Sequence, residues 1–419
     1  MTLPRVVITG LGVVSPNGIG KEAFCRAILA GKSGVKRISR FDPTDLPVQI
    51  AGEIPEFDEF AWVDPRERKH VSRVVPLAIA ASHEAICDAG IDPATMTMDQ
   101  KREIGVILGT GGGAQEFSEE QYKLWHTGHI KQVSIFCIPS GTMGTLPSEV
   151  SMRFGFRGYS HVVTTGCTSS TDAIGYAYQH ILAGVQPMFL VGGVDSTITP
   201  GIIKGYSLLH ALTRSWNHEP ERASRPFSAD RDGFVLAEGS WMFILEDYEH
   251  ARARGARWYA EIAGYASTCE AFHRVRMSES PEEPARAIRE AMAEAQVSAE
   301  DIHYVNLHGT STEMNDRVET RAVKIALGDR AYRIPMSGLK SQIGHAQGAC
   351  GSAGVAATLI AMEHGKVPPT INLDIADPDC DLDYVPDVGR TAQIGNAVCN
   401  CVGFGSKNSA LVLKRQPAQ

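Results

Sequence analysis

The chain has 419 residues, enough for two or three average domains or one large α/β unit, and enough to bury a core without disulfides. Hydrophobic residues make up 43% and charged residues 21%, which excludes a disordered chain. Lys and Arg number 40 against 48 Asp and Glu, a net charge of −8. That mild acidity argues against a nucleic-acid groove or a polybasic membrane face, so we expect neither partner.

Short strand-like runs alternate with helical patterns along the chain, which predicts α/β architecture. The expected strands are Arg5–Thr9, Ile104–Leu108, His161–Thr165, Met188–Gly192, Trp241–Leu245, Ile302–Leu307 and Ala410–Leu413. The expected helices include Pro76–Ala89, Ser170–Leu182, Pro284–Ala295 and Gly348–His364. Residues 341–362 carry no Asp, Glu, Lys or Arg over about one bilayer length. Their Gln, His, Ser and Gly residues indicate a helix buried in protein.

A faint internal repeat links two parts of the chain. The helix Pro76–Ala89 leads through a polar link into EIGVILGT, and the helix Pro284–Ala295 leads into DIHYVNLHGT. Both expected strands end in a Gly-Thr turn that can carry a site. Two similar halves explain this pattern, and so does coincidence in a common helix–loop–strand unit.

The nine cysteines and the amino terminus bear on the cellular compartment. The first residues, MTLPRVVITG, show neither the charged nor the apolar region of a secretory leader. We therefore expect free thiols and a cytoplasmic location. Cys399 and Cys401 have no second Cys or His pair at ligand spacing, so no metal site is expected.

Cys167 is the first candidate for chemistry. It follows the β-branched run His161–Thr165 and Gly166, and it precedes a Ser/Thr-rich helix start. A strand, tight turn and helix place a side chain at an exposed elbow beside free N–H groups and the positive helix end. Both effects favour the thiolate, and the amides can hold an oxyanion. The other eight cysteines are interpreted as inert small hydrophobes.

Two further candidates centre on histidines. His308 ends an expected strand before a Gly turn, and Asp316 and Glu319 then open an apparent helix on one face. Lys340 and His345 flank a glycine turn before the buried helix, where Lys340 needs a partner, such as Glu319. Each group has an ordinary structural alternative: a satisfied histidine, helix-terminal charges or a capping lysine.

Two glycine-rich turns complete the survey. Phe404 lies between Gly403 and Gly405, which suits a mobile gate or a simple hairpin turn. The stretch Gly109–Gly113 follows an expected strand. It lacks the Lys-Ser/Thr of a phosphate loop and the spaced glycines of a dinucleotide turn, so we expect no nucleotide there.

One thiol and two histidines on separate turns indicate thiolate chemistry, for which two classes compete. A cysteine peptidase needs Cys, His and an orienting Asn or Asp, and the gap from Cys167 to His308 suits it. The surroundings of Cys167 lack the aromatic-flanked signature of that class, however. Acyl transfer followed by carbon–carbon bond formation uses the thiol, both histidines and the lysine.

The motifs themselves resemble a known family. TTGCTSS around Cys167, NLHGTSTEMND around His308, GLKSQIGHAQGACG around His345 and VGFGS around Phe404 look like the four signature blocks of β-ketoacyl synthases. VVITGLGVVSPNGIG, SRPFSADRDGFVLAEGS and DPDCDLDYVP extend the likeness over essentially the whole chain. Within the family, the blocks are most similar to the ketosynthase α subunit of type II aromatic polyketide synthases, and next to the fatty-acid elongating synthase. Val402 and the pair Ser406-Lys407 depart from the usual pattern, at the gate and the pocket floor.

The resemblance implies a thiolase fold: two pseudo-symmetric mixed α/β halves in an αβαβα layering. We place the amino-terminal half, with the nucleophile, at residues 1–255 and the carboxy-terminal half, with both histidines, at 256–419. The resemblance also implies a dimer, either with a chain-length factor or with a second copy. It implies no tightly bound cofactor, because acyl groups arrive as phosphopantetheine thioesters on an acyl carrier protein. An intact Cys167 argues against a non-catalytic chain-length subunit.

The resemblance also assigns roles in a decarboxylative condensation. Cys167 is the nucleophile, and His308 and His345 are the hydrogen-bond donors to a malonyl thioester. Lys340, paired with Glu319, sets the field of the site, with Asp316 in support. Thr310 and Thr312 contact the pantetheine arm, and Phe404 supplies a gate and an oxyanion amide. A basic patch for the carrier protein has the candidates Lys69, Arg73 and Arg276.

Overall fold

A computed structural model describes residues 4–415 and contains an eleven-stranded sheet. The strand order is β11-β10-β14-β15-β9-β1-β8-β7-β5-β6, with β2 paired to β1. These strands are β1 (Val6–Ser15), β2 (Gly18–Ile19), β5 (Ile104–Gly109), β6 (Ser160–Val163), β7 (Met188–Asp195), β8 (Gly239–Asp247), β9 (Ala260–Cys269), β10 (Tyr304–Asn306), β11 (Met336–Ser337), β14 (Asn396–Gly403) and β15 (Lys407–Arg415). Two small ribbons pair β3 (Lys36–Arg37) with β4 (Ile50–Ala51) and β12 (Lys366–Val367) with β13 (Arg390–Thr391).

The α-helices of the described residues cover and divide this sheet. They are α1 (Lys21–Leu29), α2 (Val74–Asp88), α3 (Met98–Arg102), α4 (Gln115–His126), α5 (Cys137–Gly141), α6 (Leu146–Phe154), α7 (Ser169–Leu182), α8 (Pro200–Leu208), α9 (Tyr248–Ala253), α10 (Glu282–Glu294), α11 (Glu313–Leu327), α12 (Lys340–Ile343) and α13 (Cys350–His364).

The strand pairing repeats in the two halves of the sheet. In the amino-terminal half, β1–β8 and β8–β7 are antiparallel, and β7–β5 and β5–β6 are parallel. In the carboxy-terminal half, β9–β15 and β15–β14 are antiparallel, and β14–β10 and β10–β11 are parallel. The halves join where Val6 and Val7 of β1 pair with Ile262 and Glu261 of β9. The internal repeat in the sequence therefore reflects two similar folding units.

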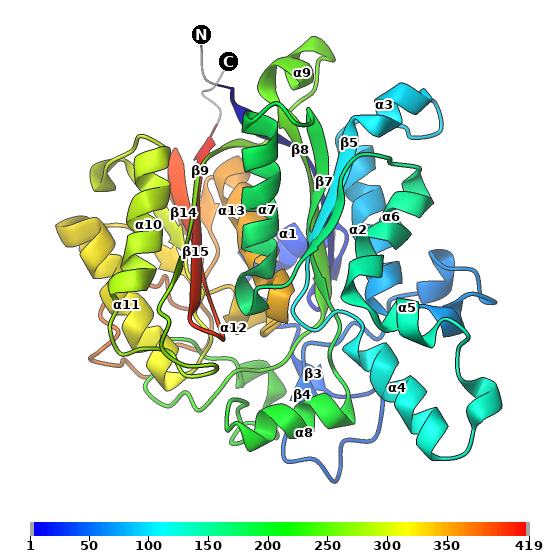
Figure 1. Ribbon diagram of the computed structural model, residues 1–419. Helices are drawn as coiled ribbons and strands as arrows, with labels where there is room; N and C mark the ends of the chain where they lie inside the picture. The colour runs from blue at the N-terminus through cyan, green and yellow to red at the C-terminus, as the bar shows by residue number, and fades with distance from the viewer. Residues whose placement is uncertain (1–3, 416–419) are drawn as a thin grey trace.

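The elements stack in the predicted αβαβα layers. Helices α7 and α13 contact each other and strands of both halves, so they form the central layer. Figure 1 shows α2 and α6 on one outer side and α10 and α11 on the other. Helix α2 packs on β1 and β8, α6 on β5 and β6, and α10 on β9 and β15, while α11 packs against α10. The charge-free stretch contributes α13, of which residues 350–362 are buried, as expected for a helix inside protein.

Tight contacts between backbones explain the glycines of this core. A Cβ on Gly12 of β1 would lie 1.9 Å from the carbonyl oxygen of Ala81 in α2. A Cβ on Gly264 of β9 would lie 2.1 Å from the carbonyl oxygen of Ala291 in α10. Only glycine permits this approach of strand and helix, and it occurs at corresponding places in both halves.

The predicted elements all occur, but their ends shift. The first strand continues six residues past its predicted end at Thr9, through Gly10 and Gly12, to Ser15. The strand predicted over Ile302–Leu307 is reduced to Tyr304–Asn306, and the helix predicted from Gly348 begins at Cys350. Strands β9 and β14 were not predicted, because Gly, Ala, Asn and Cys interrupt their β-branched pattern.

No helix within residues 4–415 is both long and apolar enough to cross a membrane. The cytoplasmic location stays a prediction. So does the division after residue 255, which falls in the connection between α9 and β9.

Candidate active site

Cys167 lies in a single 3-10 turn, Gly166–Thr168, between β6 and α7. Gly166 has a φ of 74°, which a side chain would strain, so glycine permits the sharp elbow. Gly403 of β14 packs against the elbow, because a Cβ there would lie 3.2 Å from the Cys167 nitrogen. The elbow joins the amino-terminal half to a hairpin of the carboxy-terminal half, and it leaves Cys167 6% exposed.

The prediction that the turn favours the thiolate of Cys167 is wrong, because the side chain is buried. Burial raises the pKa of the thiol above its ordinary value, while the backbone N–H of Phe404, the cation of Lys340 and its own N–H act to lower it. The buried carboxylate of Asp195 also raises this pKa. The sulfur of the unliganded site is therefore a thiol, although the predicted amides do face it.

The two predicted histidines converge on this sulfur. His308 follows β10 and His345 lies in the turn before α13, and both are buried. Their ring centroids are 5.6 Å apart, with the planes at 88°. The Cys167 sulfur and one nitrogen of each ring lie within 4.8 Å of one another. The structure thus brings together the three predicted reactive groups, one from the first half and two from the second.

Hydrogen bonds fix the tautomer of each imidazole. The backbone N–H of Gln347 donates to Nδ1 of His345 at 3.0 Å, and the ammonium of Lys340 lies 3.2 Å from Nδ1 of His308. Because these groups are donors, each Nδ1 accepts and each Nε2 carries the proton. Burial, followed by Lys340, lowers the pKa of His308 and of His345 well below the ordinary value. Both rings are neutral donors at pH 7.

The prediction of an ion pair between Lys340 and Glu319 is wrong. Lys340 instead bonds His308, through Nδ1 and the carbonyl oxygen. Glu319 accepts from the backbone N–H of His308 at 2.6 Å, from the N–H of Gly309 at 2.8 Å and from Nδ2 of Asn400 at 2.6 Å. Lys340 therefore holds His308 by its ring and its carbonyl oxygen, and Glu319 holds it by its backbone N–H.

Asp316 anchors the next residues of this turn. It lies with Glu319 in α11, and both are buried as the shared helix face predicts. Its carboxylate accepts from the backbone N–H of Thr310 at 3.1 Å and of Phe227 at 2.9 Å. Arg231 lies 3.4 Å from the same carboxylate. Burial is the main reason that the pKa of Asp316 is raised, and Arg231 opposes the shift.

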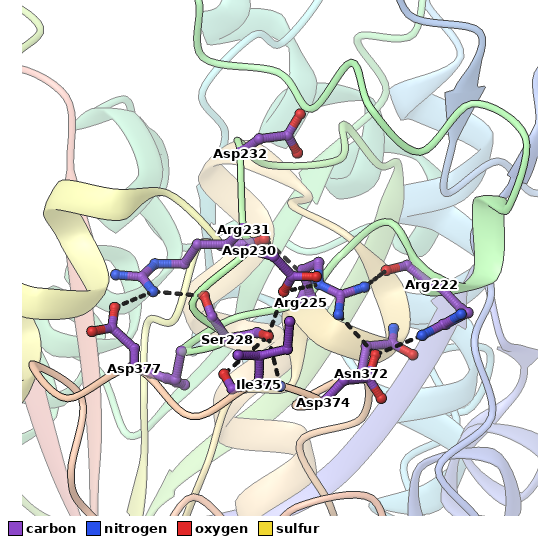
Figure 2. Close-up of polar contacts among 12 residues, drawn as sticks. Arg222, Arg225, Ser228, Asp230, Arg231, Asp232, Asn372, Asp374, Ile375 and Asp377 are labelled. Atoms are coloured by element: carbon purple, nitrogen blue, oxygen red, sulfur yellow. Dashed lines mark hydrogen bonds and ion pairs between the residues drawn. The ribbon is translucent and has the colours of Figure 1, made fainter.

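A network of arginine–carboxylate contacts lies next to Asp316. Arg231 donates to Asp377 at 2.6 Å, and Arg225 donates to Asp230 at 2.8 Å and to Asp374 at 2.7 Å. Figure 2 shows these contacts as dashed lines. The contact between Arg231 and Asp377 ties the SRPFSADRDGF block to the DPDCDLDYVP block, two of the motifs that the sequence singles out, and Arg225 binds Asp374 just before the second block. Paired in this way, the buried arginines support the histidine turn and carry no free charge.

A cavity of about 380 Å³ opens onto the three reactive groups. Thr310 and Thr312 line it, with their hydroxyls 2.7 Å apart. Phe404, at the tip of the β14–β15 hairpin, is partly exposed on the same wall. The other lining residues are Leu209, His210, Ala211, Phe234, Phe272, Val275, Arg276, Met277, Glu279, Met314, Asn315, Gln347, Val402 and Gly403.

Two cysteines interpreted as inert belong to the site. Cys401 lies 3.4 Å from Nδ1 of His308, and its sulfur donates to the carbonyl oxygen of Cys167 at 3.2 Å. Cys350 lies 3.4 Å from Nδ1 of His345. Burial raises the pKa of the Cys350 thiol to about 12 and that of the Cys401 thiol well above its ordinary value, so both stay protonated. The apolar pattern around Cys350 gives no sign that this residue belongs to the site. The position of Cys401 directly before the VGFGS block is a sign that could have identified it.

The remaining candidates are the glycine turn after β5 and the three basic residues considered for docking. The glycine turn after β5 is occupied by Asp195, whose carboxylate accepts from the N–H groups of residues 111–113, which leaves no cradle for a phosphate. Arg73 is wrong as a docking residue, because it is 3% exposed and pairs with Glu238 and Glu59. Lys69 and Arg276 are exposed, and only Arg276 lines the cavity.

Cys167, His308 and His345 are also, within residues 4–415, the group of side chains spaced to hold a metal ion. Each Nδ1 is already engaged, so Nε2 alone would be free on each ring. That the protein uses no metal stays a prediction.

A nucleophilic thiol beside two neutral donors, held between the halves of a doubled α/β fold, defines an acyltransferase of the thiolase-fold class. Residues 4–251 match the family model of the β-ketoacyl synthase N-terminal domain, and residues 259–374 match that of the C-terminal domain. The chain belongs to the β-ketoacyl synthase family.

Relatives and solved structures are similar over almost the whole chain. The chain is 42% identical to the actinorhodin polyketide putative beta-ketoacyl synthase 1 of Streptomyces coelicolor, over 98% of this chain and 88% of that protein. It is 38% identical to a 3-oxoacyl-[acyl-carrier-protein] synthase 2 of Synechocystis, over 98% of both.

Two solved structures align with 99% of this chain, and each alignment spans the whole of the solved chain. One is a type II polyketide synthase acyl-carrier protein in complex with its ketosynthase bound to the hexaketide, with a TM-score of 0.89 and 33% identity. The other is the ishigamide ketosynthase/chain length factor, with a TM-score of 0.90 and 31% identity. These likenesses agree with the predicted thiolase fold.

Proposed function

We propose that this protein is a β-ketoacyl-[acyl carrier protein] synthase that acts as the ketosynthase α subunit of a type II polyketide synthase. The observation that carries the proposal is the convergence of the Cys167 sulfur and the His308 and His345 rings within 4.8 Å at one cavity. The 42% identity to the actinorhodin relative supports the polyketide assignment.

In the first step Cys167 takes the acyl group from a carrier-protein thioester. Its sulfur attacks the thioester carbon, the bond to the pantetheine sulfur breaks, and the thiol proton ends on that departing sulfur. The N–H groups of Cys167 and Phe404, which already face the sulfur, hold the oxyanion of the tetrahedral intermediate.

In the second step a malonyl thioester occupies the vacated cavity. The two Nε2–H groups donate to its thioester carbonyl, so negative charge develops there as the carboxylate leaves as CO₂. The resulting enolate carbon attacks the acyl carbon on Cys167. The carbon–sulfur bond breaks, the thiolate of Cys167 takes a proton from solvent, and the β-ketoacyl chain leaves on the carrier protein.

The remaining predicted residues position these groups. Lys340 keeps His308 in the donor tautomer and adds positive charge near the enolate. Glu319 fixes the His308 backbone, as Asp316 does for Thr310. We propose that Thr310 and Thr312 bind the pantetheine arm and that Phe404 moves as a gate between the two steps.

The proposed macromolecular partners are an acyl carrier protein and a chain-length factor. A carrier-protein arm reaches Cys167 through the cavity mouth beside Arg276. The partner subunit would cover the edge strand β6 and the exposed apolar side chains of the segment that precedes it, which include Tyr122, Trp125, Ile130, Ile135, Ile138, Met152 and Tyr159. Monomeric proteins rarely expose so many neighbouring apolar groups. A homodimer would cover the same face.

A fatty-acid elongating synthase is the second candidate, favoured by the 38% identity to the Synechocystis relative. It shares the reaction and every residue role above. The two candidates differ in the acyl chain they extend and in the partner subunit.

Peptide mass spectrometry tests the proposal directly. The full chain is mixed with acetyl-carrier protein, digested and searched for acetyl groups on all nine cysteines. We expect the modification on Cys167 and its loss in Cys167→Ala, while Cys87→Ala, which removes an exposed thiol, keeps it. A folded chain that stays unmodified, both alone and co-expressed with a neighbouring-gene subunit, would contradict the proposal.

A further inference from the structure

Asp172 is a buried carboxylate to which the proposed reaction steps assign no role. It lies in α7, five residues after Cys167, and is 1% exposed. Its Oδ2 accepts from the hydroxyl of Thr165 at 2.5 Å and from that of Thr168 at 2.9 Å, and its Oδ1 accepts from the hydroxyl of Tyr265 at 2.9 Å. Burial raises the pKa of this carboxyl, and the hydroxyl donors act to lower it. Because a buried carboxylate is stable only when it is well hydrogen-bonded, these donors hold the side chain in one place.

The two threonines lie on either side of the nucleophile. Thr165 directly precedes the 3-10 turn Gly166–Thr168 that contains Cys167, and Thr168 ends this turn. One carboxylate oxygen therefore joins the beginning of the turn to its end. The backbone N–H of Cys167, a proposed oxyanion donor, lies within the segment that this oxygen closes. The directions of the sulfur and of that N–H thus depend on where Asp172 lies.

Tyr265 holds the carboxylate from the other half of the molecule. It lies in β9, and its ring packs directly on α7, because a Cβ on Gly175 would lie 2.4 Å from the ring atom Cδ2. A tyrosine confined in this way presents its hydroxyl in a fixed direction. The nucleophile turn is therefore held by Asp172, and Asp172 is held by the half that carries His308 and His345.

We propose that Asp172 is a positioning residue: through the two threonines it holds the Cys167 turn in the geometry that acyl transfer requires. The sulfur must approach the thioester carbon while the N–H groups of Cys167 and Phe404 face the developing oxyanion, and a small displacement of the turn disturbs both. The role is geometric, because Asp172 is not among the main causes that shift the pKa of the Cys167 thiol. This inference rests on the proposed function and adds to it a residue that does not touch the substrate.

Two reactions of the same sulfur test the inference. Acylation by acetyl-carrier protein needs the oxyanion donors, whereas alkylation by iodoacetamide is a displacement at a saturated carbon and needs none. Both rates are measured on the full chain by peptide mass spectrometry, acylation against carrier-protein concentration and alkylation against pH. Asp172→Leu should lower the maximal acylation rate by about tenfold to a hundredfold with little change in KM. The pH dependence of alkylation at Cys167 should not change.

A conservative variant and a matched pair of tyrosine variants locate the effect. Asp172→Asn should keep acylation within about threefold of wild type, because the amide oxygen can accept from both threonines and the amide nitrogen can donate to Tyr265. Tyr265→Phe removes one hydroxyl between α7 and β9 and should slow acylation by about threefold to tenfold. Tyr178→Phe is the control, because its hydroxyl also joins α7 to β9, at the Ala263 carbonyl, but lies about three helical turns beyond Cys167. It should keep the wild-type rate.

The outcomes separate the inference from the proposed function. Wild-type acylation in folded Asp172→Leu or equal rates in Tyr265→Phe and Tyr178→Phe overturn the inference. An Asp172→Asn protein as slow as Asp172→Leu, or an altered pH dependence of alkylation, also overturns it, because the charge would then matter and not the geometry. Cooperative unfolding in urea verifies the fold of each variant, and if Asp172→Leu does not fold, the two tyrosine variants decide. A wild-type chain that is not acylated, alone or with a co-expressed partner, contradicts the proposed function itself.

Discussion

In the amino-terminal half, the turn after β5 is bound by one carboxylate, and in the carboxy-terminal half the equivalent turn after β10 is bound by two. Asp195 accepts from Gly111, Gly112 and Gly113, whose side chains offer no chemistry. Glu319 accepts from His308 and Gly309, and Asp316 accepts from Thr310. The same arrangement of carboxylate and amides holds three glycines in one half, and in the other half it holds His308, the proposed hydrogen-bond donor.

A second pair of equivalent positions meets at the reaction centre. Cys167 lies between β6 and α7, and His345 lies between the corresponding elements β11 and α13. In the first half three residues, 164–166, separate the strand from the nucleophile. In the second half the connection is longer, and it holds Lys340 before His345. The duplicated fold thus supplies facing turns, and the sequence of each turn places the proposed nucleophile in one half and the proposed donors in the other.

Removing a donor from the second half should produce the largest effect. His308→Ala and His345→Ala should each lower malonyl decarboxylation by about 10²-fold to 10⁴-fold, because each deletes an Nε2–H aimed at the developing charge. Release of CO₂ from malonyl-carrier protein measures this. His129→Ala is the control, because His129 is exposed and lies far from His308 and His345 in the sequence. Full activity in both active-site variants would make the histidines structural.

Replacing Lys340 tests how the longer connection tunes those donors. In wild type both histidine pKa values lie well below the ordinary 6.5, through burial first and Lys340 second, so decarboxylation should show no inflection near pH 6.5. Lys340→Met removes the cation, which raises both pKa values. The acid limb of the pH–rate profile should therefore move upward, with about a tenfold loss near neutral pH.

The control for this prediction is Lys340→Arg, which keeps the charge and should keep the acid limb in its wild-type place. A folded Lys340→Met protein with an unchanged profile and rate would remove the electrostatic role of this residue.

The carboxylates of the two equivalent turns should separate stability from activity. Glu319→Gln and Asp195→Asn each leave a buried amide poorly paired, which should lower the free energy of unfolding by about 1–3 kcal/mol. Glu319→Gln should also reduce decarboxylation about tenfold, because it releases the backbone of His308. Asp195→Asn should change decarboxylation less.

Asp195→Asn should instead lower the pKa of Cys167, since the Asp195 charge raises it. The rate of alkylation by iodoacetamide against pH measures that shift, and urea unfolding measures stability. Equal losses of decarboxylation in the two variants would contradict the division of roles between the turns.

The sequence predicted the fold class, the order of the main elements and the three residues that the structure brings together. Cys167 and His308 lie where a strand pattern ends beside a glycine, but their roles, and that of His345, came from the family resemblance. The sequence could not predict β14, whose cysteines and asparagine give a weak strand signal, although this strand brings Cys401 beneath His308. It also paired Lys340 with Glu319. Charge complementarity suggested that contact, but the competing backbone amides of the His308 turn decide it, and those are set by tertiary structure.

The prediction that the turn favours the thiolate of Cys167 was wrong for a similar reason. The turn and helix start are visible in the sequence, but the burial that outweighs them comes from the facing hairpin of the other half. Likewise Arg73 is indistinguishable from a surface cation until Glu238 and Glu59 are seen beside it.

The smallest effect concerns the two connections that precede α2 and α10, which are equivalent in the two halves. The first presents Lys69 away from the cavity and the second presents Arg276 at its mouth. If an acidic carrier protein docks at the mouth, Arg276→Glu should raise its KM about threefold to tenfold with little change in kcat, and added salt should reduce the difference. Lys69→Glu should have a smaller effect, and Arg102→Glu, on exposed α3, should have none. Steady-state kinetics at two ionic strengths measures all three. A larger effect at Lys69 than at Arg276 would move the docking surface to the amino-terminal half, towards the face proposed for the partner subunit.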